Sequence, residues 1–311
     1  MINAPNKLLK KKVLVTGASG FIGAHLCRCL ATTAAELHGI SRTPQPTGSH
    51  MQWWQGDLAD ITSVRTLIRH VQPDVVYHLA SNVTGSRDLD RVLPTLHSNF
   101  VSTVNLLTAL TEIGCDRIVL AGSLEEPEIN RGSITPSSPY AAAKWAGSAY
   151  SQMFYELYQT PVVTAKIFMV YGPEQDSRFL IPTVISSLIS GISPKLSSGK
   201  RPIDWVYIDD LISGLIAMAD APDIAGQTID LGTGKLSTIR EVVERIVTWI
   251  DRRVEPLFGT IPDRINEQIR VANAANSYAQ LGWRATTSLE EGLKSTIDWY
   301  ADRLQMTAPK F

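Results

Sequence analysis

The chain of 311 residues carries 44% hydrophobic and 19% charged side chains, the composition of a globular protein large enough to bury a sizeable core. Its formal net charge of −1 provides no long-range field that would favour binding to nucleic acid or to an anionic membrane. No apolar run reaches the roughly 18 residues of a membrane span, and the N-terminus lacks the apolar core of a secretory signal. The three cysteines lack a zinc-site spacing, so we expect reduced thiols in a cytoplasmic protein that holds no metal.

Short apolar segments alternate with helical patterns over the first two-thirds of the chain. Strands are predicted at residues 12–17, 37–41, 51–56, 74–81, 116–123 and 162–168. Four of them, which begin at 12, 74, 116 and 162, are apolar nearly throughout, as is typical of parallel strands covered on both faces. This alternation predicts an α/β fold with a doubly wound parallel sheet.

A long helix is predicted over residues 95–114, between the fourth and fifth strands. Its apolar positions fall on one stripe, and Gly114 is expected to end it. The stripe consists of Leu96, Phe100, Val104, Leu107 and Leu110. A partner within the chain and a second subunit would both explain such a stripe.

The pattern changes after about residue 172, where the loops become longer. Two later helices start with capping-box signals, Thr238 with Glu241 and Ser288 with Glu291, and residues 227–232 read as a short strand. We predict a dinucleotide-binding domain and a smaller C-terminal substrate-binding region. The first spans residues 1–171, with 204–232 returning to it, and the second consists of 172–203 and 233–311.

A glycine-rich loop joins the first strand to the first helix in the sequence VLVTGASGFIGAHL. Gly17, Gly20 and Gly23 have the spacing G-x-x-G-x-x-G. Glycines at such positions permit a tight turn and a close backbone approach, so that the helix N-terminus can face a pyrophosphate. Because a strand precedes the loop and a helix follows it, the pattern favours a dinucleotide site over an ordinary strand–helix turn.

The ends of the second and third strands bear on the choice of coenzyme. Dinucleotide sites usually place an acid at the end of the second strand to bind the ribose 2′-hydroxyl, whereas an arginine accommodates a 2′-phosphate. This chain has Ser41 and Arg42 there, which predicts that NADP(H) is preferred over NAD(H). After the third strand, Asp57 is open to two roles, a contact with the adenine amino group or a cap for the following helix.

The segment SSPYAAAK places a phenol and an ammonium group on one helix face. Ser138 is a suitable N-cap and Pro139 suits the first helical position, so Tyr140 and Lys144 lie one turn apart. A neighbouring ammonium and a cationic nicotinamide would lower the phenol pKa from its usual value near 10. Tyr140 could then exchange a proton with a substrate oxygen as hydride moves, and Ser123 could hydrogen-bond the same oxygen. An amphipathic helix start is the alternative, which the glycine loop disfavours.

The Y-x-x-x-K pattern, the upstream serine and the T-G-x-x-G-x-x-G loop together resemble the short-chain dehydrogenase/reductase superfamily. Length and C-terminal features are similar to its extended branch of NAD-dependent epimerases and dehydratases, which act on nucleotide sugars. Further matching segments are YHLAS (77–81), SNFVSTVNLL (98–107), VYGP (170–173), DWVYIDDL (204–211) and LGW (281–283). The resemblance covers essentially the whole chain and implies a Rossmann fold.

The resemblance also implies roles for individual residues. Ser123, Tyr140 and Lys144 would be the catalytic triad, and Asn99 would support the packing near the lysine. The dinucleotide contacts would be Gly17, Ser19, Gly20, Phe21, Ile22, Gly23, Arg42, Asp57, Leu58, Leu79, Ala80, Tyr140 and Lys144. Family members commonly dimerise through the helices at about 95–113 and 139–157, so a homodimer is expected. His78, in a buried strand, is interpreted as a core residue rather than a base.

The loop after Ser123 bears on the reaction, which in this branch is 4-epimerisation, 4,6-dehydration or reduction of a 4-keto sugar. Thymidine-linked dehydratases place an Asp–Glu pair after the catalytic hydroxyl, whereas this chain has Leu124 and Glu125, and leucine cannot donate a proton. The GSLEEP stretch and the short distance to Tyr140 resemble 4-keto-6-deoxyhexose reductases, and Arg42 agrees with NADPH consumption.

We therefore expect an NADP(H)-dependent reductase of a nucleotide-diphosphate-linked 4-keto-6-deoxyhexose. The alternative is a redox-neutral 4-epimerase or 4,6-dehydratase with tightly bound NAD, for which Glu125 is either a catalytic group or a loop carboxylate. A non-catalytic dinucleotide-binding module is disfavoured because it would not need Ser123, Tyr140 and Lys144.

Binding of a nucleotide diphosphate needs cations, and arginine can pair with phosphate through two parallel bonds. By family position, Arg264 is the strongest candidate and Arg178 the weakest. Two residues depart from the family pattern: Met169 stands where asparagine is usual, and Ile203 where arginine is usual, so that Lys200 or Arg201 would have to compensate. The predicted substrate-binding residues are Ser123, Met169, Arg178, Arg201 and Arg264.

Overall fold

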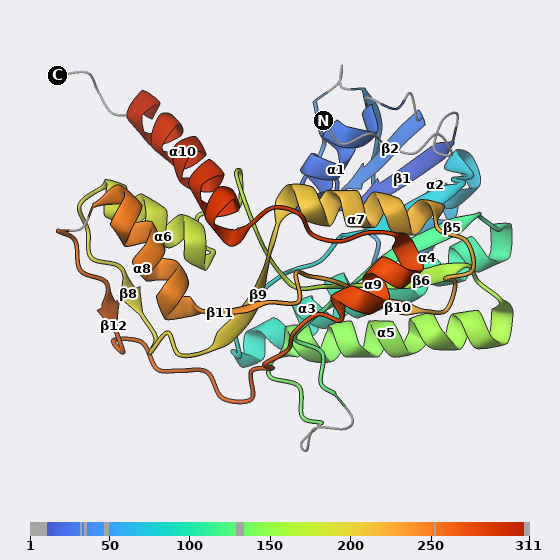
Figure 1. Ribbon diagram of the computed structural model, residues 1–311. Helices are drawn as coiled ribbons and strands as arrows, with labels where there is room; N and C mark the ends of the chain where they lie inside the picture. Colours follow the sequence, from blue (N-terminus) through green and yellow to red (C-terminus); the bar gives the residue numbers. More distant parts are fainter. Residues whose placement is uncertain are drawn as a thin grey trace.

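A seven-stranded sheet forms the centre of the protein, seen in a computed structural model that describes residues 11–31, 33, 36–46, 50–128, 134–251 and 253–307. All neighbouring strands are parallel, in the order β10-β6-β5-β4-β1-β2-β3 (Figure 1). The strands are β1 (Lys12–Thr16), β2 (Glu36–Ser41), β3 (Met51–Gln55), β4 (Val75–His78), β5 (Arg117–Ser123), β6 (Val162–Ile167) and β10 (Thr228–Leu231). The predicted α/β fold with a doubly wound parallel sheet is confirmed.

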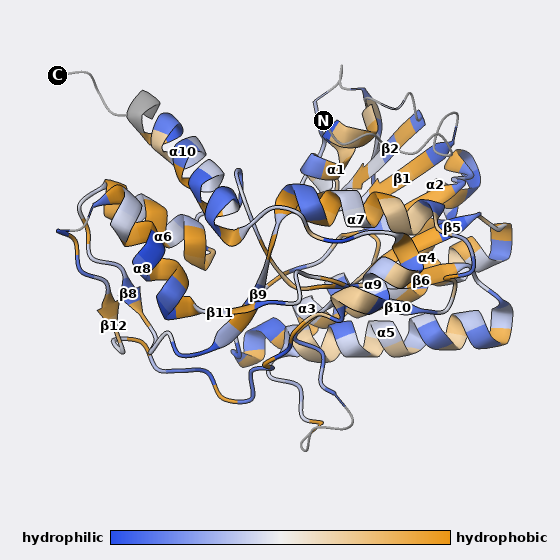
Figure 2. Cartoon of the chain, viewed as in Figure 1, coloured by the Kyte–Doolittle hydropathy of each residue, from blue (hydrophilic) through white to orange (hydrophobic). Residues whose placement is uncertain are grey.

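Helices cover both faces of the sheet and divide the core into two clusters. Helices α1 (Phe21–Ala31) and α7 (Ile208–Asp220) pack on one face, and α2 (Ile61–Val71), α4 (Ser102–Ile113) and α5 (Pro139–Tyr158) pack on the other. Alternate residues of one strand therefore pack in different clusters. Val13 and Val15 pack with α1 and α7, and Leu14 packs with α2 and α4. Figure 2 shows the resulting hydrophobic colour along the central strands, as expected for a sheet buried on both sides.

The strand order reverses at β1, which lies between β2 and β4. In open parallel sheets, such a reversal creates a crevice outside the carboxyl ends of the strands, where ligands bind. The predicted strand 74–81 ends early, at His78, because the chain turns there to pass over the end of β1. The backbone N–H of Leu79 donates to the Thr16 carbonyl at 3.3 Å, and that of Ala80 donates to the Thr16 hydroxyl at 3.1 Å.

The helix predicted over 95–114 contains a change of winding. It begins earlier, with a 3₁₀ turn η2 (Leu89–Arg91) and α3 (Val92–Thr95), continues as a π-helical segment η3 (Leu96–Val101) and ends in α4 before Gly114, whose φ is 88°. The wider π turn rotates the later residues relative to a regular helix. Leu107 and Leu110 of the predicted stripe are buried, whereas Leu96 is 38% exposed and the polar Asn99 is buried, so packing within the chain accounts for only the later part of the stripe.

The C-terminal elements form a smaller layer beside the main sheet (Figure 1). Its sheets join β7 (Met169–Tyr171), β9 (Pro202–Tyr207) and β11 (Leu236–Thr238), and β8 (Lys195–Leu196) with β12 (Leu257–Phe258). Its helices are α6 (Leu180–Ile189), α8 (Ile239–Ile250) and α10 (Leu289–Thr307), whereas α9 (Ala274–Leu281) returns to the main sheet and packs against β10 and α7.

The capping predictions for this region are confirmed. Thr238 and Glu241 form a reciprocal capping box at α8, and Ser288 and Glu291 exchange the same pair of bonds at α10. Strand β10 joins the main sheet beside β6, while the precise division into two domains stays a prediction. Among the described residues, no helix is long and apolar enough to cross a membrane.

Candidate active site

The glycine loop lies at the carboxyl edge of the sheet and admits no larger side chains. Gly17 has φ of +71°, and a Cβ there would lie 2.7 Å from the backbone nitrogen of Ala80. A Cβ on Gly23 would collide with the Gly17 carbonyl, which also accepts a bond of 2.9 Å from the N–H of Gly20. The backbone of this loop is thus open to a close-lying phosphate group at the start of α1. The other predicted contacts of this region, Ser19, Phe21, Ile22 and Leu79, lie on the same turn, in the first turn of α1 and directly after β4.

The end of β2 carries a hydroxyl and a guanidinium group. The Ser41 hydroxyl accepts bonds from the N–H of Thr43 at 3.2 Å and from the Gln45 amide at 3.1 Å. Arg42 is exposed, and its carbonyl accepts a bond from Gln55 at 3.3 Å, which links the ends of β2 and β3. The contact of Arg42 with a coenzyme stays a prediction.

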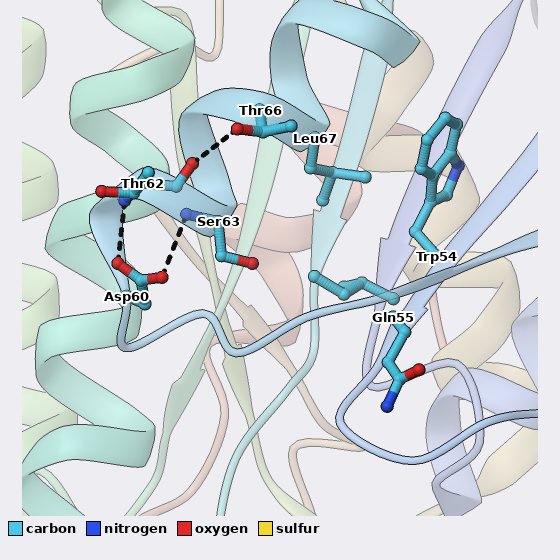
Figure 3. A pocket seen from close by; sticks show the side chains of 8 residues that line it. Trp54, Gln55, Asp60, Thr62, Ser63, Thr66 and Leu67 are labelled. Carbon is cyan, nitrogen blue, oxygen red and sulfur yellow. Dashed lines mark hydrogen bonds between the residues drawn. The ribbon is translucent and has the colours of Figure 1, made fainter.

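A pocket of about 250 Å³ lies between the end of β3 and the start of α2. Figure 3 shows the side chains that line it, among them Trp54, Asp60 and Leu67. The cap of α2 is Asp60, whose carboxylate accepts bonds from the N–H groups of Thr62 at 3.0 Å and Ser63 at 3.3 Å. Asp57 instead accepts from the N–H of Ala59 at 2.9 Å. Capping by Asp57 is therefore wrong, because the helix begins one turn later than that role requires. Leu58, the next predicted contact, is buried beside it.

Two buried polar residues hold the end of β4. His78 is bonded through one ring nitrogen to Thr16 at 2.8 Å and through the other to Thr103 at 3.0 Å, and burial lowers its pKa to about 3. It is the neutral core residue that was predicted. The Asn99 amide accepts from the N–H of Asn82 at 2.7 Å and donates to its carbonyl at 3.1 Å, which fixes the segment that follows Ala80.

Ser123, Tyr140 and Lys144 come together where β5 ends and α5 begins. Ser138 caps α5 as predicted, accepting a bond of 3.2 Å from a backbone N–H of the first turn. The Lys144 ammonium is buried and donates to the Ala121 carbonyl at 2.8 Å. The Ser123 hydroxyl, also buried, is hydrogen-bonded to the Tyr140 phenol. The structure thus places the three groups so that one substrate oxygen could contact both hydroxyls.

Burial governs the proton affinities of this trio. The pKa of Tyr140 is raised to about 12, chiefly by burial, with the carboxylates of Glu126 and Glu125 acting in the same direction and the bond to Ser123 in the opposite direction. Burial likewise lowers the pKa of Lys144 to about 8, against the attraction of Glu126. Lowering of the phenol pKa by the ammonium together with a cationic nicotinamide stays a prediction, because it concerns the protein with its coenzyme bound.

The three residues after Ser123 point in different directions. Leu124 is 5% exposed and packs in the core, so it does not line the site. Glu125 is half-buried and forms an ion pair of 2.8 Å with Arg201, and it also accepts a bond of 3.4 Å from Ser137. Glu126 is 4% exposed and accepts a bond of 2.6 Å from the N–H of Ser123. Sequence reasoning missed Glu126, because two adjacent glutamates in a loop carry no sign of which one is buried.

Two of the predicted substrate arginines share a carboxylate. Arg201 contacts Glu267 at 3.3 Å and donates to the Gln268 carbonyl at 2.6 Å, in addition to its bond with Glu125. Arg264 lies 3.6 Å from the same Glu267, and its guanidinium rests against Gly85 in the loop after β4. The structure thus brings Arg201 and Arg264 to the side of the crevice that faces the C-terminal layer.

Arg178 lies apart from this group. Its side chain is 80% exposed and binds Asp176 through two bonds of 2.9 and 3.1 Å. Met169 begins β7, where it pairs with Trp205 of β9, and Ile203 is buried in the core.

Comparison with known proteins agrees with this geometry. Residues 13–232 match the model of the NAD dependent epimerase/dehydratase family. A dTDP-glucose 4,6-dehydratase of Haemophilus influenzae is 25% identical over 93% of this chain and 97% of its own. A UDP-glucose 4-epimerase of Mycolicibacterium smegmatis is 27% identical over 94% and 100%.

One solved structure is a UDP-glucuronic acid 4-epimerase from Bacillus cereus in complex with UDP-glucuronic acid and NAD. It superposes with a TM-score of 0.82 at 25% identity and covers 94% of this chain and 99% of its own. The family match covers well over half of the chain and includes every residue of the glycine loop and of the Ser123–Tyr140–Lys144 trio. The protein is therefore an enzyme of the NAD-dependent epimerase/dehydratase family.

Proposed function

We propose that the protein is a nucleotide-sugar 4-epimerase that works without net oxidation or reduction, with a tightly held nicotinamide dinucleotide. The observation that carries this proposal is the pairing of a complete Ser123–Tyr140–Lys144 trio with a buried Leu124. The trio suits oxidation and reduction at one carbon. Elimination of water needs an additional acid. At the position where thymidine-linked dehydratases have an aspartate, this chain has Leu124, whose side chain is buried in the core.

The residues around the crevice are suited to a dinucleotide. Gly17 packs so closely on Ala80 that no side chain fits there, and this contact sets the glycine loop at the start of α1, where a helix N-terminus can bind a diphosphate. A bound nicotinamide would accept hydride from C4 of the sugar and return it. Relatives and structural neighbours that are nucleotide-sugar 4-epimerases, including one in complex with NAD, support this assignment.

Proton transfer in this proposal belongs to Tyr140. As the phenolate, Tyr140 takes the proton from the C4 hydroxyl and becomes the neutral phenol, which returns that proton after the sugar ring has turned over, while the Ser123 hydroxyl holds the same oxygen in line. Lys144 keeps a positive charge beside the phenol, held in place by the Ala121 carbonyl. Glu125 takes no part in the proton transfer, because its carboxylate is bound by Arg201.

We further propose that Arg264 and Arg201 serve the diphosphate. Arg264 is the more exposed of the two, at 57%, and is therefore free to turn toward a ligand. Arg201 directly precedes β9, two residues before Ile203, where the family pattern has its arginine. Arg42 supports NADP(H) as the coenzyme, since it lies exposed at the end of β2.

Reduction of a 4-keto-6-deoxyhexose, the reaction first expected from the sequence, is the second candidate. Arg42 favours it, because a consumed coenzyme is commonly NADPH. Reduction of a 4-keto sugar also agrees with the ion pair between Glu125 and Arg201, because this reaction needs no second base.

The deciding experiment supplies UDP-glucose, UDP-glucuronic acid and dTDP-glucose without added coenzyme and follows C4 configuration by proton NMR. The epimerase proposal expects a C4 epimer from one of them, and NADP or NAD in the supernatant after the protein is denatured. No epimer, together with stoichiometric NADPH oxidation by a nucleotide 4-keto-6-deoxyhexose, would replace it with the reductase.

We also propose a homodimer. The turn at η2 and α3 exposes a group of apolar side chains, and Phe100 and Tyr150 stack edge to face at 5.0 Å where this region meets α5. The exposed group consists of Leu89, Val92, Leu93 and Leu96. Burying these residues against a second copy would remove a patch that a monomer leaves in water.

A further inference from the structure

Glu126 holds the backbone of Ser123 through both of its polar groups. The Glu126 carboxylate accepts a bond of 2.6 Å from the N–H of Ser123, and the N–H of Glu126 donates to the Ser123 carbonyl at 3.2 Å. The next residue, Leu124, is fixed to β6 by a bond of 3.0 Å to the Ile167 carbonyl. The backbone of Ser123 is therefore held in a closed ring of bonds with Glu126, while its hydroxyl accepts a bond of 3.2 Å from the N–H of Glu125.

The carboxylate occupies a space that the surrounding chain leaves for it. Glu126 is 4% exposed, which is rare for a glutamate. A Cβ on Gly122 would lie 2.9 Å from its Oε1 and 2.8 Å from the Thr164 methyl group, so only glycine leaves room here. A charged group held this deeply must be balanced by cations or it would take up a proton.

Burial is the largest influence on Glu126 and raises its pKa, while the bond from the Ser123 N–H and the ammonium groups of Lys166, from β6, and Lys144, from α5, act in the opposite direction. The same carboxylate acts on the catalytic groups, since its charge favours the protonated forms of both Lys144 and Tyr140. Glu125 is the other acidic group that acts on the phenol, and Arg201 neutralises it.

We propose that Glu126 is a positioning residue of this site, which fixes Ser123 through its backbone and places a buried negative charge near Lys144 and Tyr140. The inference deepens the proposed epimerase function and rests on it for the role of the trio. Glu126 itself has no route to the substrate, because its oxygen is turned to the Ser123 backbone.

The test separates the charge from the hydrogen bond. Glu126→Gln keeps an oxygen that can accept from Ser123 and loses the charge. Glu126→Asp keeps the charge, but its side chain is shorter and forms a poorer hydrogen bond with the N–H of Ser123. The matched control is Glu156→Gln, an exposed glutamate on α5 that bonds only to Gln152 among the contacts described.

The first readout is the ionisation of Tyr140, recorded as tyrosinate absorbance of each protein minus that of the same protein carrying Tyr140→Phe. Glu126→Gln is expected to move the Tyr140 midpoint down by about one pH unit, since a like charge has been removed. Glu126→Asp should leave the midpoint in place, and so should the control. An unchanged midpoint in Glu126→Gln overturns the proposal, as does an equal shift in Glu156→Gln.

The second readout is the pH profile of kcat/KM. Both limbs should move to lower pH in Glu126→Gln, whereas Glu126→Asp should lower kcat about tenfold with both limbs unmoved. A lower rate with no displacement in Glu126→Gln would make the residue merely structural and overturn the charge role. Because the tyrosinate titration needs no substrate, it tests Glu126 even if the epimerase assay fails. If Glu126→Gln does not fold, the test depends on Glu126→Asp alone. A displaced midpoint of the Tyr140 titration in this variant refutes the inference.

Discussion

Removal of the Arg201 guanidinium tests what Glu125 does. Arg201 is 13% exposed and its partner Glu125 is 19% exposed, and Arg201 also binds Glu267 and the Gln268 carbonyl. In Arg201→Ala, the carboxylate of Glu125 and that carbonyl would lose their donor while remaining largely shielded from water. If Glu125 is the partner of Arg201 and not a proton donor, the loss appears in stability and substrate affinity rather than in the chemical step.

The size of the effect follows from these exposures. Breaking a fully buried ion pair costs about 3–5 kcal/mol, and an exposed pair contributes about 0–1 kcal/mol. With both side chains mostly but not fully covered, Arg201→Ala should lower the free energy of unfolding by about 2 kcal/mol. Glu125→Gln should lower it by about 1 kcal/mol, because Arg201 keeps Glu267 and the carbonyl. The double variant should reveal a coupling of about 1 kcal/mol.

The assay is urea unfolding of the wild type, both single variants and the double variant, with kcat measured on the same samples. Arg178→Ala is the control for stability, since that arginine is 80% exposed and should change the unfolding free energy by less than about 0.5 kcal/mol. Glu125→Gln should keep kcat within a few-fold of the wild type. A coupling of zero, or a loss of about a hundredfold in kcat for Glu125→Gln, would refute the reasoning and make Glu125 a catalytic acid or base.

Three further predictions address the trio and the assembly. Tyr140→Phe should abolish nearly all turnover while the coenzyme content, measured after denaturation, stays that of the wild type; full activity would rule out the proton transfer assigned to Tyr140. The pKa of Lys144 is lowered to about 8 in the folded protein from 10.5, so the unfolded chain binds more protons between these values. Relative to Lys144→Met, the wild type should therefore gain stability, on the order of 2 kcal/mol, as pH rises from about 8 to 10. The free energy of unfolding of both proteins is measured in urea at each pH, and a constant difference between them would contradict the buried ammonium. Leu93→Asp, at a side chain 63% exposed, should convert a dimer to monomers in light scattering without lowering the unfolding temperature; an unchanged mass would exclude this face as the interface.

The sequence by itself determined those features that depend on near neighbours in the chain. The continuous apolar strands, the Ser138 cap of α5 and the capping box at Thr238 all follow from local periodicity or from hydrogen bonds within one turn. The glycine loop belongs to this group too, because a positive φ at Gly17 is a property of one residue. The i, i+4 spacing of Tyr140 and Lys144 likewise sufficed to predict a shared helix face.

Only the tertiary structure decided which polar groups are buried and what they meet. Leu124, Glu125 and Glu126 are consecutive, yet one packs in the core, one pairs with Arg201 and one bonds to the Ser123 backbone. Their surroundings come from β6, β9 and the loop at 264–270, which are distant in sequence. The pKa of Tyr140 also depended on this packing, because the loss of water around the phenol is the largest cause of its rise. Burial is a property of the assembled layers, so no local pattern could have supplied it.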